Sequence, residues 1–245
     1  MKKCAQHALA PDAAPLRFAA QVKRKPLARP LRNKGKSMIE VGEILAILAK
    51  KRPIFHSEAD FQHAFAWEIH QRLPNAFVRL ELPVQVKNEY LHIDIWVKNQ
   101  DEVLAVELKY KTRSLSVEID GEHYRLKNQS AQDVGRYDFI KDIQRLERVA
   151  VGQKNFVGYA VLLTNDSAYW IKPSNHDTVD AKFRINDGRV LEGVFDWGAN
   201  ASDGTEKNRE QSLVLRNKYV VQWEIFSRPS PASYGEFRSL TIKVT

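Results

Sequence analysis

Hydrophobic and polar positions in the first half of the chain follow helical spacing and then strand spacing. Residues 38–51 carry apolar residues at helical spacing and stop before Pro53. Ser57 is a preferred N-cap residue, and the acids just after it suit the positive end of a helix dipole. The pattern therefore predicts a first helix over 38–51 and a second from Ser57 to about Leu73.

Three strands, a helix and a further strand are predicted next. Pro83 lies within the first strand and indicates an edge position or a break, since proline has no N–H for a strand partner. The last strand is apolar throughout, which is typical of burial on both faces. The predicted segments are Phe77–Val86, Leu91–Val97, Val103–Tyr110, a helix over about 131–149 and Phe156–Thr164.

The rest of the chain reads as β-strands with loops. Asp187-Gly188 is a turn signal between 183–186 and 189–194. Residues 196–211 are polar and are expected to form a mobile loop, and 219–226 with 237–244 are expected to form a closing hairpin. The expected fold class is α/β with a mixed central sheet and a C-terminal β-rich extension.

The positive charge of the chain is concentrated at its start. Residues 1–36 hold ten basic residues against the single acid Asp12, a charge of +9 that leaves about −1 of the total +8 for residues 37–245. The basic balance therefore does not indicate that the folded part binds nucleic acid. We expect 1–36 to be a disordered leader, or an upstream extension of a reading frame that begins at Met38, and 37–245 to form one domain.

Composition limits the location of the protein. Cys4 is the single cysteine, so an intrachain disulfide is excluded and a reducing compartment is favoured. No apolar stretch is long enough to span a membrane. The expected location is cytoplasmic, with no membrane partner.

The two strands 91–97 and 103–110 bring together the chemistry-bearing residues. Strand side chains alternate faces, so Leu91, Ile93, Ile95 and Val97 should share one buried face. The opposite face then carries Asp94, Glu107 and Lys109. The tightest turn, at Gln100-Asp101, places Asp94 opposite Glu107, with Cβ atoms about 5 Å apart.

Two opposed carboxylates repel unless a positive charge lies between them. A divalent cation bound by Asp94 and Glu107 would supply it, and Lys109 would offset charge beside it. The alternative is an ordinary solvated hairpin face on which Lys109 neutralises Glu107.

Asp94 followed by Glu107-Leu108-Lys109, on the second and third strands between two helices, resembles the PD-(D/E)XK nuclease core over about 57–164. Ile93 stands where that pattern has proline. The resemblance implies an αβββαβ restriction-endonuclease-like core, a Mg²⁺ or Mn²⁺ cofactor, and cleavage of nucleic-acid phosphodiester bonds, with Asp94 and Glu107 as metal ligands. Many members add a glutamate from the first helix; Glu68 is preferred here, with Glu58 as the alternative.

The helix over 131–149 carries Lys141, Arg145 and Arg148 on one face. This face could meet phosphates, but interleaved acids favour a solvated, ion-paired surface. Two hypotheses follow: a metal-dependent nuclease acting on DNA, or a non-catalytic nucleic-acid-binding or interaction module on the same fold. Nucleic acid is the expected partner, and a homodimer is left open.

Overall fold

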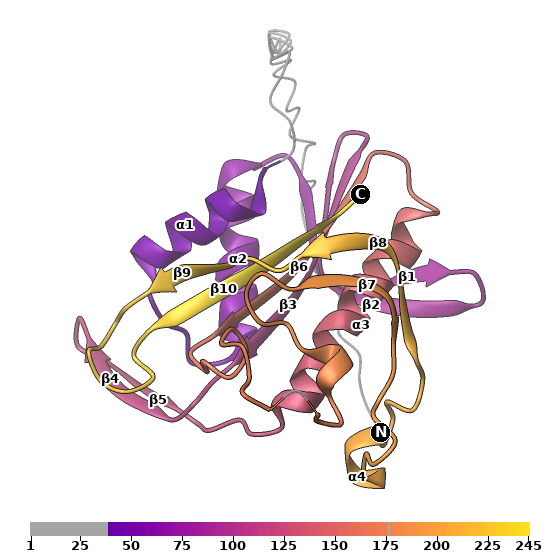
Figure 1. Cartoon of the computed structure of the whole chain (residues 1–245). Coiled ribbons are helices and arrows are strands. Elements are labelled where there is room, and N and C mark those ends of the chain that lie inside the picture. The colour runs from indigo at the N-terminus through magenta and orange to yellow at the C-terminus, as the bar shows by residue number, and fades with distance from the viewer. Residues whose placement is uncertain (1–38, 176) are drawn as a thin grey trace, which may run out of the picture. The chain divides into compact units, whose positions relative to one another are not determined.

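A mixed six-stranded sheet runs through the computed structural model, which describes residues 39–175 and 177–245 (Figure 1). The strand order is β1-β2-β3-β6-β10-β9, with β3 and β6 parallel and the other neighbours antiparallel. An α/β fold with a mixed central sheet is therefore confirmed. The strands are β1 Phe77–Val86, β2 Glu89–Asn99, β3 Glu102–Lys111, β6 Phe156–Thr164, β9 Trp223–Ser227 and β10 Phe237–Val244.

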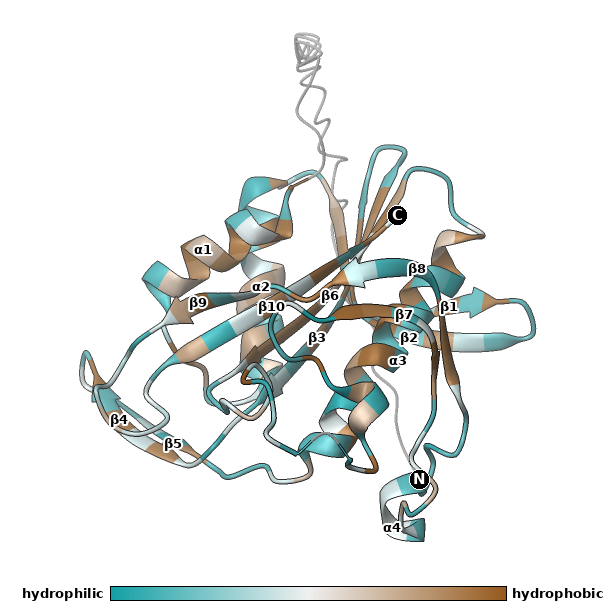
Figure 2. Ribbon diagram, viewed as in Figure 1, coloured by the Kyte–Doolittle hydropathy of each residue, from teal (hydrophilic) through white to brown (hydrophobic). Residues whose placement is uncertain are grey.

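Different elements cover the two faces of this sheet. Helices α1 (Val41–Lys51) and α2 (Glu58–Arg72) pack on one face with the buried side chains of β3 and β6. Helix α3 (Gln132–Ala150) covers the other face, together with the two-stranded sheet of β7 (Val190–Phe195) and β8 (Leu213–Val220). Hydrophobic residues line the central strands in Figure 2, as expected for a sheet between two layers.

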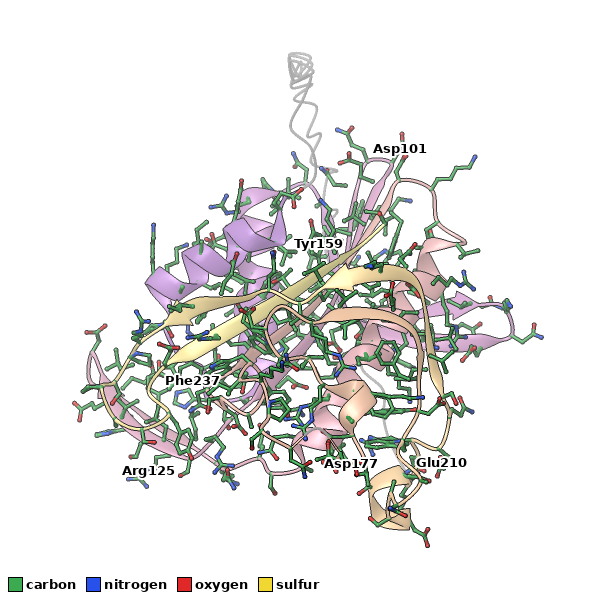
Figure 3. The ribbon with its side chains drawn as sticks, in the orientation of Figure 1. Asp101, Arg125, Tyr159, Asp177, Glu210 and Phe237 are labelled. Carbon is green, nitrogen blue, oxygen red and sulfur yellow. The ribbon has the colours of Figure 1, made fainter. Side chains whose placement is uncertain are left out.

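The side chains follow the same division between inside and outside. Asp101 at the β2–β3 turn and Arg125 extend outward, whereas Phe237 is fully buried between the layers (Figure 3). Within the described residues, no helix is both long and apolar enough to cross a membrane.

Local sequence signals explain where α2 begins and ends. The Ser57 hydroxyl accepts a hydrogen bond from the amide of Asp60 at 3.1 Å, which satisfies one of the free N–H groups of the first turn. The helix ends at Arg72, two residues before Pro74. The predicted N-cap is confirmed.

Three predicted strands have the predicted bounds: β1, β6 and β10. β1 is an edge strand, as Pro83 indicated. The predicted closing hairpin is present as β9 paired antiparallel with β10, although β9 begins at Trp223. From α2 to β6 the order is a helix, three strands of the central sheet, two strands of a separate hairpin (residues 115–126), a helix and a strand.

Two segments differ from expectation. The polar stretch after β3 contains a hairpin, β4 (Leu115–Ile119) with β5 (Glu122–Leu126), whose turn Asp120-Gly121 has φ of 52° and 83°. Asp-Gly is a strong signal for this turn, because glycine has no Cβ to clash at positive φ.

The second difference lies near the C-terminal end. Asp187-Gly188 is a turn, but it does not join two paired strands, because Ala181–Phe183 forms a 3₁₀ turn (η1) and β7 pairs with β8. The predicted loop 196–211 contains the short helix α4 (Asp203–Glu206). The expectations for residues 1–36 and for Met38 lie outside the described residues.

Candidate active site

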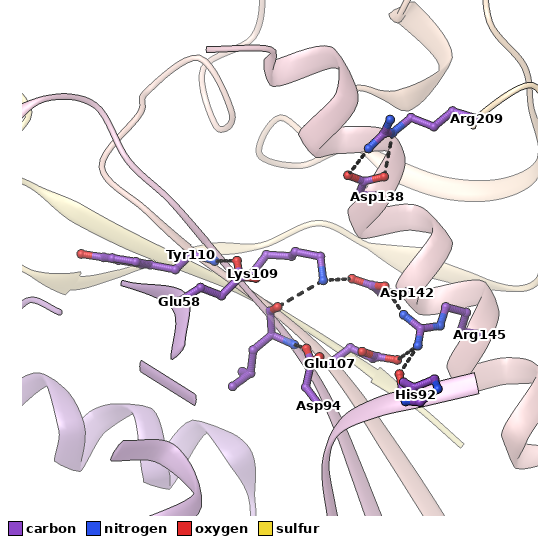
Figure 4. A network of polar contacts seen from close by, with 11 residues as sticks. Glu58, His92, Asp94, Glu107, Lys109, Tyr110, Asp138, Asp142, Arg145 and Arg209 are labelled. Carbon is purple, nitrogen blue, oxygen red and sulfur yellow. Dashed lines mark hydrogen bonds and ion pairs between the residues drawn. The ribbon is translucent and has the colours of Figure 1, made fainter. Parts of the chain in front are cut away.

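The β2–β3 hairpin has the predicted register. Paired residues run from Asn99–Glu102 beside the turn to Ile95–Val106. The next step would place Asp94 opposite Glu107. The backbone pairing stops before that step, and the Asp94 side chain bonds to β3 there: its Oδ2 accepts a hydrogen bond from the amide of Leu108 at 2.6 Å (Figure 4).

The alternation of faces along β2 is broken at Asp94. Ile93 packs in the hydrophobic cluster with α3, whereas Ile95 packs in the cluster with α1 and α2. The expectation that Leu91, Ile93, Ile95 and Val97 share one face is therefore wrong. The sequence pattern could not reveal this break, because both faces of the sheet are covered and an apolar residue is buried whichever face it lies on.

The neighbouring edge strand is irregular at the same level. Glu81 on β1 has φ of 50°, a left-handed conformation that is unfavourable for a residue with a Cβ. The side-chain amide of Gln62 on α2 donates to the carbonyl of Asp94 and to the carboxylate of Glu81, both at 2.8 Å. Helix α2 therefore holds the irregular backbone that directs Asp94 toward β3.

Glu107 is the most deeply buried acid of the predicted set. Its side chain is 0% exposed, and neither carboxylate oxygen accepts a hydrogen bond from any described residue. The cation that forms an ion pair with it is Arg145 on α3, whose Nη2 lies 3.2 Å from Oε1. Burial, then repulsion from Asp142 and Asp94, raises the pKa of Glu107 to about 10.

Lys109 is held by an acid that the sequence analysis did not select. Its Nζ lies 2.8 Å from Oδ2 of Asp142 on α3, and the other oxygen of Asp142 is 3.1 Å from Nη1 of Arg145. Arg145 also donates to the carbonyl of His92 (Figure 4). Although burial lowers the pKa of Lys109, Asp142 and Asp94 raise it more, so its pKa lies well above the ordinary value.

Asp94 is less buried than Glu107. Burial is the largest cause that raises the pKa of Asp94, to about 6, against the opposing effects of Lys109 and the Leu108 amide. Asp94, Glu107 and Asp142 thus form a cluster of three carboxylates with two cations, Lys109 and Arg145, among them.

Glu58, not Glu68, is the α2 carboxylate that reaches β3. Its Oε2 accepts a hydrogen bond from the amide of Tyr110 at 2.7 Å. Asp94 and Glu58 therefore satisfy two alternate β3 amides, at Leu108 and Tyr110, beyond the paired part of β2. The structure does not bring Glu68 to this cluster.

Glu68 pairs with cations of its own layer. Its carboxylate lies 2.7 Å from Nζ of Lys51 and 3.3 Å from Nε of Arg72, the residue one helical turn later. These contacts lower the pKa of Glu68, with the Lys51 hydrogen bond as the largest cause. A structural ion pair accounts for a buried glutamate at this position.

The charged residues of helix α3 form ion pairs, as expected for the alternative of a solvated, ion-paired surface. They are not all solvated, however. Arg136, Asp142 and Glu147 are buried, and Arg148 forms an ion pair with Glu89. Asp142 lies three residues after Phe139 and four before Leu146, both fully buried, so it falls on the apolar stripe. An acid on that stripe was the signal that could have identified it.

The donor set fits a hard divalent cation, because carboxylate oxygens are its preferred protein ligands and two buried oxygens here accept no hydrogen bond from the described residues. These oxygens are Oε1 and Oε2 of Glu107, whereas Oδ2 of Asp142 is already held by the Lys109 ammonium. As the side chains stand, ion pairs with Lys109 and Arg145 hold the cluster. In the described part of the chain, no group of three or more His, Cys, Asp or Glu side chains is arranged to hold a metal ion.

No protein-family model, curated protein or solved structure matches this chain.

Proposed function

We propose that this protein is a metal-dependent nuclease of the PD-(D/E)XK type that hydrolyses phosphodiester bonds of nucleic acid, with DNA as the substrate. The observation that carries the proposal is the Glu107 carboxylate, buried without a hydrogen-bond donor from the described residues and next to Asp94 and Lys109. A buried carboxylate in this state costs stability, which favours a ligand-binding role over a structural one.

Asp94 and Glu107 would hold Mg²⁺ or Mn²⁺. Asp142 contacts Lys109 and Arg145, and its negative charge raises the pKa of both Asp94 and Glu107. When bound, such an ion polarises a phosphate oxygen and lowers the pKa of a coordinated water. Glu107 must first lose its proton, because only the carboxylate can be a ligand. Release of that proton would be coupled to cation binding, because the charge of the ion would offset the repulsion from Asp94 and Asp142 that keeps Glu107 protonated.

Lys109 acts on the reacting phosphate in this proposal. An ammonium group has no lone pair for a metal, so its contribution is charge and hydrogen bonding. In the absence of substrate, Asp142 holds the Lys109 ammonium at 2.8 Å. Asp142 is thus a positioning residue for Lys109, and Arg145 positions Asp142 in turn at 3.1 Å.

The second candidate is a non-catalytic nucleic-acid-binding or interaction module. It is favoured by one observation: Lys109 and Arg145 already offset the charge of the cluster through ion pairs with Asp142 and Glu107. A cluster completed by its own cations has less need of a metal ion.

A cleavage assay separates the two candidates. Single- and double-stranded DNA and RNA would be incubated with the full chain and with Mg²⁺, Mn²⁺ or EDTA. We expect cleavage that requires the ion and disappears in Glu107→Gln, while the control Glu192→Gln, an exposed strand glutamate paired with Lys218, retains it. Cleavage of equal rate in EDTA or in Glu107→Gln would exclude this site, and no cleavage of any substrate would favour the module.

A further inference from the structure

A second cluster of charge lies in the segment between β6 and β7, on the face of the sheet that carries α3. It surrounds a cavity of about 80 Å³, whose lining residues include three cations, Lys172, Arg184 and Arg189, and two asparagines, Asn175 and Asn186. About 10–15 Å³ suffices for one water, so the cavity has room for a small polyatomic ligand.

Positive charge exceeds negative charge around this cavity. The carboxylate of Asp180 pairs with both Arg136 and Arg184, one guanidinium at each oxygen. Arg189 forms no ion pair with any acid that the structure describes; its two terminal nitrogens donate to the carbonyls of Ala181 and Lys182, both at 2.7 Å. Asp180 therefore offsets two of the guanidinium groups, while no acid of the described residues forms an ion pair with Arg189.

The guanidinium groups also repel one another. Burial, followed by the charge of Arg184, lowers the pKa of Arg136 and the pKa of Arg189. An anion among them would relieve this repulsion. The hydrogen bonds of Arg189 to the backbone fix its position in advance, which reduces the entropy lost when a ligand binds.

An unused donor accompanies the unbalanced charge. The Nε atom of Arg184, a residue that lines the cavity, is buried and donates to no acceptor in the described part of the chain. The side chain of Arg184 is 17% exposed, so little water reaches it to replace the missing partner. Buried donors without acceptors are costly unless a ligand supplies the acceptor.

We propose that the cavity formed by Lys172, Arg184 and Arg189 binds a tetrahedral oxyanion, namely phosphate or a phosphate monoester. Guanidinium groups match the oxygens of phosphate with paired N–H donors, and a lysine adds a mobile charge at the rim. The ligand is either free inorganic phosphate or the terminal phosphate of a nucleic-acid strand. This site is separate from the carboxylate cluster and does not depend on the nuclease proposal.

Calorimetric titration of the full chain with inorganic phosphate is the first test. We expect binding by the wild type, and about tenfold weaker binding by Lys172→Gln, since one charge-assisted contact is lost. Lys172 is exposed, so this variant should fold normally. Arg184→Gln should lose binding, with circular dichroism as the check on its fold.

Lys182→Gln is the matched control. It removes one lysine from the same segment, but Lys182 pairs with Asp196 and does not line the cavity. We expect this variant to bind phosphate as the wild type does. Equal affinity in the wild type, Lys172→Gln and Arg184→Gln would overturn the proposal, as would the absence of binding in the wild type.

Two oligonucleotides of one sequence, with a 5′-phosphate or a 5′-hydroxyl, identify the source of the anion. Fluorescence anisotropy in EDTA avoids cleavage during the measurement. A preference for the 5′-phosphate that disappears in Lys172→Gln would identify a strand terminus; equal binding of the two strands, with phosphate binding intact, would identify the free ion. Phosphate binding that is lost in Glu107→Gln would place the anion at the carboxylate cluster and overturn this second site.

Discussion

Two buried glutamates, Glu107 on β3 and Glu147 on α3, differ in what their carboxylates contact. Glu147 accepts hydrogen bonds from the amides of Arg216 and Asn217, each at 2.9 Å in its shorter contact, and from the hydroxyl of Tyr219 at 2.9 Å. Glu107 accepts none from the described residues, and its contact is an ion pair with Arg145. Burial alone therefore does not identify a functional acid.

The difference lies in how each carboxylate is compensated. The hydrogen bonds to Glu147 replace those that water would make, and they fasten β8 to α3, so a structural role explains the residue. The charge of Glu107 is compensated only in part, which favours the protonated form and leaves two oxygens free for a ligand. The comparison predicts that Glu107 matters for activity and Glu147 for stability.

The largest expected effect is on cleavage. Lys109→Ala should lower the cleavage rate by about 10²-fold or more, the usual effect of losing one charge-stabilising group, while metal binding persists because lysine is not a ligand. Asp94→Asn and Glu107→Gln should lose both. Calorimetric metal titration beside the cleavage assay checks this split, and a Lys109→Ala protein that cleaves at the wild-type rate would remove the lysine from the mechanism.

Stability should show the opposite order for the two glutamates. Glu147→Ala should lower the free energy of unfolding by about 3 kcal/mol, because it leaves three donors without their acceptor, of which the Tyr219 hydroxyl is buried and the two amides are partly buried. At about pH 4.5, where the raised pKa of Glu107 does not yet lower the stability of the wild type, Glu107→Gln should change it by less than about 1 kcal/mol. The substitution removes no hydrogen bond and leaves Arg145 with Asp142 and the His92 carbonyl. Urea unfolding measures both, and a larger loss for Glu107→Gln would reverse the comparison.

The pH dependence of stability tests the protonation of Glu107. Its pKa rises from 4.5 to about 10 on folding, so the folded state binds the proton more tightly than the unfolded state. This contribution is complete below about pH 4.5 and is lost as the pH rises through about 10. The wild type should therefore lose stability relative to Glu107→Gln between pH 5 and 10, by at most about 1.4 kcal/mol per pH unit.

Parallel unfolding curves of the two proteins across that range would mean that Glu107 is ionised in the folded state. Metal affinity provides a second check on the same proton. It should rise with pH above about 6, because the cation displaces a proton from Glu107 and because Asp94, with a pKa of about 6, is then ionised.

The smallest expected effect is that of Tyr219→Phe. This change removes one of the donors to Glu147 and should cost about 1 kcal/mol in the free energy of unfolding. It should leave cleavage and metal binding unchanged, since its hydroxyl contacts Glu147 and not the carboxylate cluster. A loss of cleavage without a loss of stability would show that the two buried acids are not independent.

The sequence predicted the parts of the fold that depend on short-range patterns. Apolar runs located β1, β6 and β10, and the two-residue turn at Gln100-Asp101 determined the pairing of β2 with β3. The hairpin of β4 and β5 was missed although its signals are present: Leu115, Val117 and Ile119 alternate with polar residues, and Asp120-Gly121 is a turn signal. The partner of β7 was missed because β8 lies about twenty residues later in the chain.

The candidate site was predicted in part for the same reason. Asp94, Glu107 and Lys109 lie on neighbouring strands, and strand geometry brings them together. Asp142 and Arg145 come from α3, and helical periodicity identifies the face of a helix without showing which strand it meets. Glu58 and Glu68 were both candidates, and the contact of Glu58 with the Tyr110 amide depends on how α2 crosses β3.

The most direct test of the nuclease account is a Mn²⁺ titration followed by calorimetry at pH 8, on the wild type, Glu107→Gln and Tyr219→Phe. The account predicts one binding site in the wild type, accompanied by release of a proton, retention of that site in Tyr219→Phe and its loss in Glu107→Gln. Equal binding by Glu107→Gln and the wild type would contradict it, because the ion would then be held somewhere other than the buried carboxylate cluster.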